Sequence, residues 1–312
     1  MSNVENSGDD GTLLRARINN FVEPESGLTI GALQALEALE SIGKKLKLTL
    51  RLPFAIKSQT DSLQQALTEY LKDSLHGHAL ILSINVDIQA AATQSNVQAI
   101  PNVKNIIAVA SGKGGVGKSS TAVNLALALQ QEGASVGVLD ADIYGPSQPL
   151  MLGVAEGTRP QVVDQKYFLP IEAQGLQTMS MGYMTGEKTP MVWRGPMASG
   201  ALMQMIQQTR WKPVDYLIID MPPGTGDIQL TLSQQIPCTG SVVVTTPQNI
   251  ALLDARKGVE MFNKVGIPCF GIIENMATHI CSQCGHQEAI FGEGGGENLS
   301  QNYDMPLLGQ LP

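Results

Sequence analysis

The segment Gly112–Ser119 has the residue types and spacing that bind phosphate. Its sequence, GKGGVGKS, fits the pattern G-x-x-x-x-G-K-[ST], in which glycines let backbone N–H groups turn toward the phosphates of a nucleotide. Lys118 would act as a catalytic group at the β- and γ-phosphates, and the Ser119 hydroxyl would bind Mg²⁺, which prefers oxygen ligands. The predicted nucleotide-binding residues are Gly112, Lys113, Gly114, Gly115, Val116, Gly117, Lys118, Ser119 and Ser120.

A second nucleotide pattern overlaps this segment. Its glycines also satisfy G-x-G-x-x-G, the turn that binds dinucleotides, and Asp140 ends the next predicted strand, where an acid that binds ribose belongs. A dinucleotide fold does not need Lys118 and Ser119, nor a second acidic strand end at Asp220. We therefore predict a phosphate loop for a nucleoside triphosphate and keep the dinucleotide site as the alternative.

Two predicted strands end in carboxylates that suit a magnesium nucleotide. Asp220 closes the apolar run Tyr216–Ile219, where an aspartate of the Walker-B type would hold Mg²⁺ through water. The segment Met221–Asp227 that follows has the glycines of a switch that senses the γ-phosphate. Asp140 and Asp142 point the same way if their strand continues, so that one of them can orient the attacking water. The alternative for this pair is a helix cap, a position that favours aspartate.

Cys281 and Cys284 form a C-x-x-C pair, which can hold a metal ion or a cluster. Gly285 allows backbone N–H groups to turn toward the sulfur atoms. Two ligands are fewer than the four that a zinc ion or a [4Fe-4S] cluster takes, so three interpretations stay open. Zinc completed by His286 and one more group is the first, a redox dithiol is the second, and a cluster shared by two chains is the third.

The remaining sulfur-containing residues have simpler interpretations. Cys238 and Cys269 lie at or next to apolar runs, which favours packing as small buried side chains. Seven methionines fall between Met179 and Met205, around the segment Val192–Pro196. Methionine fills irregular gaps in cores, so we expect core packing there, with a dimer or client surface as the alternative.

Composition excludes several classes of protein. The 312 residues are 43% hydrophobic and 15% charged, which is enough for one large or two smaller folded domains. The net charge is −8, and the chain has no cluster of Lys and Arg, so nucleic acid is not expected as a partner. The first ten residues are polar and acidic, and no apolar run approaches the roughly 18 residues of a membrane span. We therefore expect no membrane partner and a cytoplasmic protein.

The pattern after residue 104 predicts the elements that position these residues. Short apolar runs alternate with helical patterns over 104–312, which is typical of an α/β fold, the doubly wound and mostly parallel sheet of a P-loop NTPase domain. Ligands bind such sheets at the carboxyl ends of the strands. The expected strands are Ile106–Ala110, Val136–Asp140, Tyr216–Asp220, Val242–Thr245 and Cys269–Glu274. The expected helices are Lys118–Gln130, Asp227–Gln235 and Leu252–Val265.

Residues 12–89 predict a small N-terminal α/β domain. Strict alternation of apolar residues in 46–52 and in 80–88 predicts two strands that each bury one face. Apolar residues at helical spacing lie between them, behind Asp61 and Ser62, either of which can cap the helix. A stretch rich in Ala, Gln and Asn, residues 90–103, has neither period and is predicted to be a linker to the second domain.

Three features together resemble a known family. The phosphate loop contains an extra lysine, Lys113, and two further segments, Asp140–Ser147 (DADIYGPS) and Met221–Asp227 (MPPGTGD), accompany it. In these residues the chain resembles the Mrp/ApbC family of deviant Walker-A ATPases. The resemblance covers about residue 102 to the C-terminus, and the preceding small domain is also similar to the family's N-terminal domain.

The resemblance implies an ATP-binding and ATP-hydrolysing carrier that assembles or transfers a [4Fe-4S] cluster to apo-proteins. It implies a homodimer in which Lys113 reaches the partner's phosphates, Asp142 positions water and Asn275 recognises adenine. For Cys281 and Cys284 it favours the cluster shared by two chains. The expected cofactors are therefore ATP, Mg²⁺ and a [4Fe-4S] cluster.

Two other functions are the alternatives. The first is a partitioning or positioning ATPase of the same deviant class, which usually has an amphipathic C-terminal helix or a basic patch. Neither is evident in the sequence, and that function leaves Cys281 and Cys284 unexplained. The second is a zinc-stabilised NTPase. The sequence stops at Pro312, where the family normally continues, so we expect uncovered apolar surface near the last strand to lower stability and adenine binding.

Overall fold

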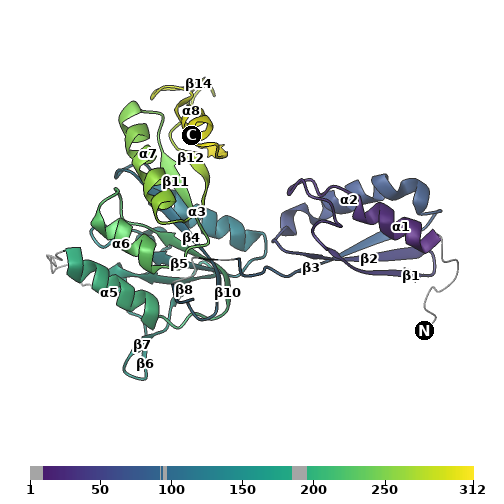
Figure 1. The fold of residues 1–312 in the computed structure, drawn as a ribbon, viewed down its shortest axis with the longest axis horizontal. Coiled ribbons are helices and arrows are strands. Elements are labelled where there is room, and N and C mark those ends of the chain that lie inside the picture. The colour runs from purple at the N-terminus through teal and green to yellow at the C-terminus, as the bar shows by residue number, and fades with distance from the viewer. Residues whose placement is uncertain (1–9, 92, 94–96, 185–194) are drawn as a thin grey trace. The chain divides into compact units, whose positions relative to one another are not determined.

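The computed structural model describes residues 10–91, 93, 97–184 and 195–312 (Figure 1). Contacts within the chain divide it into two compact units. The first unit runs up to Gln89 and includes Gln131–Ala134, and the second comprises Ala90–Gln130 and Ser135–Pro312.

The first unit packs helices against one three-stranded sheet. Its elements are α1 (Asp10–Asn19), β1 (Leu36–Ile42), β2 (Lys45–Leu52), α2 (Thr60–Leu71) and β3 (Ala79–Val86). The strand order is β1-β2-β3, with β1 antiparallel and β3 parallel to β2. Leu48 and Leu50 of β2 are fully buried in one core with Leu67 and Leu71 of α2, as the alternation and the helical spacing predict.

The predicted cap of α2 is wrong. The helix begins at Thr60, directly after a 3-10 turn, and the residue before it is Gln59, whose side chain makes no capping hydrogen bond. Because the 3-10 turn continues into the helix, Asp61 and Ser62 lie inside the first turn rather than ahead of it. Asp61 still suits this place, since a negative charge near a helix N-terminus is favourable.

The prediction of a one-faced strand over 80–88 holds for its first half. Leu80 and Leu82 are buried, whereas Val86 at the end of β3 is 43% exposed. Ile88 is buried but lies beyond the end of the strand. Two elements of this unit, α1 and β1, were not expected, because charged residues interrupt the apolar pattern in both.

The second unit is built on an eight-stranded sheet. Its strands are β4 (Val103–Ser111), β5 (Val136–Asp140), β8 (Ile171–Ala173), β9 (Leu176–Ser180), β10 (Val214–Asp220), β11 (Gly240–Thr245), β12 (Cys269–Glu274) and β15 (Leu307–Gln310). Their order is β15-β12-β11-β4-β10-β5-β9-β8, and every neighbouring pair is parallel except β8 with β9. The predicted α/β fold with a mostly parallel sheet is confirmed.

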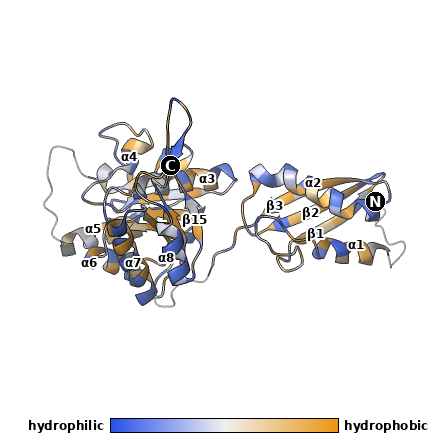
Figure 2. Cartoon of the chain, turned by 90° about the horizontal axis from the view of Figure 1, so that it is seen from above, coloured by the Kyte–Doolittle hydropathy of each residue, from blue (hydrophilic) through white to orange (hydrophobic). Residues whose placement is uncertain are grey.

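Helices and two small hairpins complete this unit. The helices are α3 (Lys118–Gln131), α4 (Gln148–Met151), α5 (Gly195–Gln208), α6 (Asp227–Gln235), α7 (Asn249–Lys264) and α8 (Gly295–Tyr303). The hairpins pair β6 (Val162–Val163) with β7 (Tyr167–Phe168), and β13 (His279–Ile280) with β14 (Gln287–Glu288). Figure 2 shows hydrophobic strands at the centre of the unit and helices of mixed colour around them. Over the described ranges, none of the helices combines the length and the apolar character that a membrane crossing requires.

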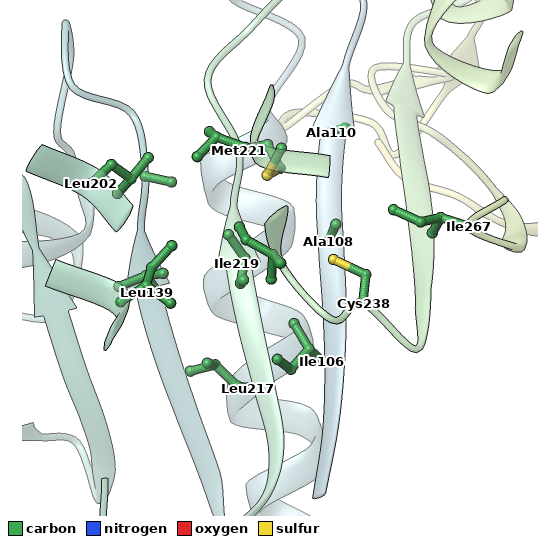
Figure 3. Close-up of a cluster of buried hydrophobic side chains, with 14 of the residues drawn as sticks. Ile106, Ala108, Ala110, Leu139, Leu202, Leu217, Ile219, Met221, Cys238 and Ile267 are labelled. Carbon is green, nitrogen blue, oxygen red and sulfur yellow. The ribbon is translucent and has the colours of Figure 1, made fainter. Parts of the chain in front are cut away.

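The core of the second unit lies between the sheet and the helices α5, α6 and α7. Figure 3 shows Ile106 and Ala108 of β4 beside Leu217 and Ile219 of β10, and Leu202 of α5 belongs to the same cluster. Strands β5 and β11 are buried at every position, as expected for parallel strands covered on both faces. In the sheet, β10 lies between β4 and β5, so the carboxyl ends of these three strands meet at one edge.

The predicted core packing of the methionines is confirmed for part of the set. Met179, Met181 and Met205 are buried in the core cluster. Met197 is 62% exposed, so core packing is wrong for that residue. Met191 and the residues 192–194 lie outside the described residues.

Candidate functional site

The phosphate loop connects β4 to α3, the strand and helix between which the motif was predicted to lie (Figure 1). Two of its glycines are required by close neighbours. A Cβ atom on Gly112 would lie 2.1 Å from the backbone carbonyl carbon of Asp254, which belongs to α7. Gly117 has φ +85°, and a Cβ atom there would lie 2.1 Å from Nδ2 of Asn275. The loop therefore follows a backbone path that larger residues at these two positions would block.

Three predicted functional groups meet at the start of α3. The Lys118 ammonium contacts Oδ1 of Asp220 in an ion pair whose side chains are 7% and 0% exposed. The same ammonium lies 3.3 Å from the Ser119 hydroxyl oxygen. The structure thus brings together the lysine predicted for the phosphates and both residues predicted for Mg²⁺. Their proximity follows from the pairing of β10 with β4.

The sequence analysis missed Gln148, which lies at the same place. Its Nε2 donates to Oδ2 of Asp220 at 2.9 Å and to the backbone oxygen of Ser119 at 3.0 Å. The side chain is 1% exposed. A single glutamine has no characteristic spacing, and the one available signal was its position directly after the segment Asp140–Ser147.

Asp140 organises the loop that follows β5. Its carboxylate accepts hydrogen bonds from the backbone N–H groups of Asp142, Ser147 and Gln148, at 3.2, 3.0 and 3.1 Å, and from the Ser180 hydroxyl at 3.0 Å. Burial, together with the negative charge of Asp220, raises the pKa of Asp140 to about 7. The residue at the cap position of α4 is Ser147, so the alternative interpretation of Asp140 as a helix cap is wrong, and its carboxylate instead holds the loop between β5 and α4.

Asp142 lies two residues beyond the end of β5 and is 9% exposed. Its Oδ1 accepts a hydrogen bond from the backbone N–H of Gly145 at 3.2 Å. This contact leaves further lone pairs of the carboxylate available, so the water-positioning role remains a prediction.

Lys113 and Asn275, whose roles follow from the family resemblance, both lie at the phosphate loop. The hydroxyl of Ser111 donates to the backbone oxygen of Lys113 at 2.8 Å, while the Lys113 ammonium contacts no acceptor among the described residues. Asn275 follows β12, and its Nδ2 donates to the backbone oxygen of Val116 at 3.0 Å. Asn275 therefore supports the phosphate loop, and its contact with adenine remains a prediction.

The cysteine pair lies at the turn of the β13–β14 hairpin. The backbone N–H of Cys281 donates to the His286 oxygen at 2.9 Å, and the N–H of Gly285 donates to the Cys281 oxygen at 2.9 Å. Hydrogen bonds from the backbone N–H groups of Cys284 and Gln283, and from the Cys284 thiol, lower the pKa of the Cys281 thiol. Cys284 is exposed, and Cys281 is half-buried. The hairpin thus presents two accessible thiols and favours the thiolate form of one of them.

The described residues supply this pair with no third ligand. In the ranges that the structure describes, no three side chains of His, Cys, Asp or Glu gather in a metal-binding arrangement. Burial raises the pKa of the Cys238 thiol to about 12, and burial also raises the pKa of Cys269, which is half-buried. The predicted burial is confirmed for Cys238 and is partial for Cys269. One chain therefore offers two thiols at the hairpin.

The fold and the phosphate site define the chain as a P-loop NTPase. A family model described as ParA, NUBPL iron-transfer P-loop NTPase, matches residues 102–312, and the chain belongs to this family. The resemblance to the Mrp/ApbC carriers is thereby confirmed. Among its relatives, the iron-sulfur cluster carrier protein of Pseudomonas fragi is 65% identical over 231 residues, which cover 74% of this chain and 80% of that one.

Two further comparisons cover the chain differently. The iron-sulfur cluster carrier protein of Haemophilus influenzae is 51% identical over 98% of this chain and 82% of its own length. A solved nucleotide-binding protein from Archaeoglobus fulgidus, in complex with ADP, superposes with a TM-score of 0.60 at 35% identity. It covers 68% of this chain and 82% of that chain. The first of these relatives extends the similarity over both units. The second is a complex with a nucleotide, and its fold is similar to that of this chain.

Proposed function

We propose that this protein binds and hydrolyses ATP with Mg²⁺ and carries a [4Fe-4S] cluster to apo-protein clients in the cytoplasm. The observation that carries the proposal is the accessible thiol pair of Cys281 and Cys284, in a unit that also contains a phosphate loop. Relatives of 51% and 65% identity that are named iron-sulfur cluster carriers support it. A partitioning ATPase would have no use for the two thiols.

MgATP binding exchanges one ion pair for two. The Lys118 ammonium and the Asp220 carboxylate neutralise each other in a buried site, where unpaired charges are costly. The phosphates of ATP offer Lys118 a new anionic partner, and Mg²⁺ offers Asp220 a cation. Since both charges are compensated again, the site can take up the nucleotide complex without leaving either side chain unpaired.

The residues present fit a magnesium ion. Mg²⁺ takes oxygen ligands and keeps several of its water molecules in such sites. The Ser119 hydroxyl and the Asp220 carboxylate supply oxygen, and the buried Oε1 of Gln148 accepts no hydrogen bond from the described residues. When bound, Mg²⁺ would neutralise charge that develops on the phosphates. Ser119 and Asp220 would hold the ion.

A homodimer would complete both functions. Lys113, whose ammonium contacts no acceptor among the described residues, is free to reach the phosphates of a partner subunit. Asp142 would orient the attacking water at the edge of the same site. A [4Fe-4S] cluster takes four cysteines, and Cys281 and Cys284 from each of two chains supply four. ATP would thus control the association of the subunits that hold the cluster.

Anaerobic reconstitution tests the proposal. We expect about four irons per dimer in the wild type, because four thiolates hold one cubic cluster. Cys281→Ala and Cys284→Ala remove two of the four ligands in the dimer, so both should lose the cluster while they still bind ATP. Cys269→Ala is the matched control and should keep the cluster, because that thiol lies on β12. Iron and zinc analysis with analytical ultracentrifugation decides the matter. A monomer with a full cluster, or stoichiometric zinc without iron, contradicts the proposal.

A further inference from the structure

Gln148 occupies the phosphate site without a role in the proposed function. It begins α4, and its side chain reaches back into the buried region between β10 and the phosphate loop. Through Nε2 it connects the carboxylate of Asp220 to the backbone of Ser119, the two residues that suit Mg²⁺. The amide group of Gln148 therefore fixes the distance between Asp220 and Ser119.

The orientation of this amide is determined by its partners. The side-chain oxygen and nitrogen of glutamine are easily exchanged in a structure, so the hydrogen bonds must decide between them. Both neighbours of Nε2, the Asp220 carboxylate and the Ser119 carbonyl, are acceptors, and an oxygen in the place of Nε2 would face two other oxygens. The nitrogen therefore occupies this place, and Oε1 points elsewhere.

Oε1 of Gln148 is buried and has no hydrogen-bond donor among the described residues. An amide oxygen without a donor is costly to bury, and such atoms in folded proteins call for a partner. Within one amide the oxygen lies about 2.2 Å from the nitrogen. Since Nε2 is 2.9 Å from Oδ2 of Asp220, Oε1 lies at most about 5 Å from that oxygen, in the region of the proposed magnesium site. The missing donor is therefore to be sought at that site.

We propose that Gln148 is a positioning residue for the magnesium ion, whose Oε1 accepts a hydrogen bond from a water molecule bound to the ion. Mg²⁺ keeps several waters, and each water on a cation donates both of its hydrogens. Nε2 holds the Asp220 carboxylate in the orientation that the ion needs. Groups that orient the ligands of a metal in this way contribute roughly 10- to 100-fold to its affinity. This inference rests on the proposed binding of MgATP.

The test measures the affinity for a fluorescent ADP analogue as a function of Mg²⁺ concentration, and again with EDTA. For Gln148→Leu we expect the Mg²⁺ concentration at half-saturation to rise by roughly 10-fold or more. Its affinity for the nucleotide in EDTA should fall by a smaller factor than its affinity for Mg²⁺. Gln148→Glu loses the donor and adds a negative charge beside Asp220, so its affinity for the nucleotide in EDTA should fall. Because it keeps an oxygen that can accept from water on the ion, Mg²⁺ should restore more of the affinity than in Gln148→Leu.

The two variants separate positioning from a structural role. If Gln148 served only to hold α4 and the loop, both substitutions would remove its donor bonds and weaken nucleotide binding equally with and without Mg²⁺. That result would overturn the inference, as would an unchanged Mg²⁺ dependence of Gln148→Leu, even if its turnover fell. A wild type that binds no nucleotide would instead refute the proposed function itself.

Discussion

The buried ion pair between Lys118 and Asp220 predicts that two lysines of one loop differ sharply in their effect on stability. Lys118→Met leaves the Asp220 carboxylate buried without its cation, and breaking such a pair costs about 3–5 kcal/mol. Nε2 of Gln148 still donates to Asp220, which places the expected loss at the lower end, about 3 kcal/mol. For a unit of this size, 1 kcal/mol shifts Tm by about 2–4 °C, so Tm should fall by about 6–12 °C.

Lys113→Met is the matched control for this prediction. Lys113 lies in the same loop, but its ammonium has no acceptor among the described residues, so Tm should change by less than about 2 °C. The double variant Lys118→Met/Asp220→Asn removes both charges and should recover most of the loss, because a neutral pair needs no compensation. Calorimetry in the absence of nucleotide measures all three. Equal melting temperatures for Lys118→Met and Lys113→Met would refute the buried pair.

Three more predictions concern other parts of the unit. Gly117→Ala should weaken nucleotide binding at least tenfold, because the added Cβ would meet the side-chain amide of Asn275. The double variant Gly117→Ala/Asn275→Ala should recover part of the lost affinity. Equal affinities of the single and double variants would argue against this contact. The raised folded-state pKa of Asp140 contributes stability below pH 4 that is lost as pH rises to about 7, so the Tm advantage of the wild type over Asp140→Asn should shrink from pH 5 to pH 8. A constant difference would contradict the raised pKa. Iodoacetamide at pH 7.5 should label Cys281, whose pKa is lowered, before Cys238, whose pKa is raised to about 12. Mass spectrometry of the native protein measures the order of labelling, and labelling of Cys238 first would contradict the prediction.

The sequence was sufficient for the elements that carry strong local patterns. The phosphate loop and the apolar strand that ends in Asp220 could be placed because their residue types serve one structure and one chemistry together. β11 was found as a short apolar run of the type buried in a parallel sheet, and α6 as a helix that fits between two such strands. The expectation that the carboxyl ends of parallel strands meet at one edge then correctly predicted that Lys118, Ser119 and Asp220 lie close together.

What the sequence could not provide depends on contacts between distant residues. Gln148 is 72 positions from Asp220 along the chain, and only the pairing of β5 with β10 brings its loop to that carboxylate. Asn275 was assigned to adenine through the family resemblance, whereas its hydrogen bond to Val116 follows from the place where β12 ends. The cap of α2 was misplaced because a 3-10 turn ahead of the helix leaves no clear signal in the sequence.

Cluster transfer to a client is the measurement that tests the central claim most directly. Protein reconstituted anaerobically is mixed with an apo-enzyme that needs a [4Fe-4S] cluster, and recovery of the enzyme's activity is followed with an iron chelator present to exclude free iron. We expect the wild type to activate the client in proportion to the cluster it holds. Cys281→Ala and Cys284→Ala, treated identically, should activate none. If these variants restore the client as well as the wild type does, the thiol pair does not carry the cluster and the account is wrong.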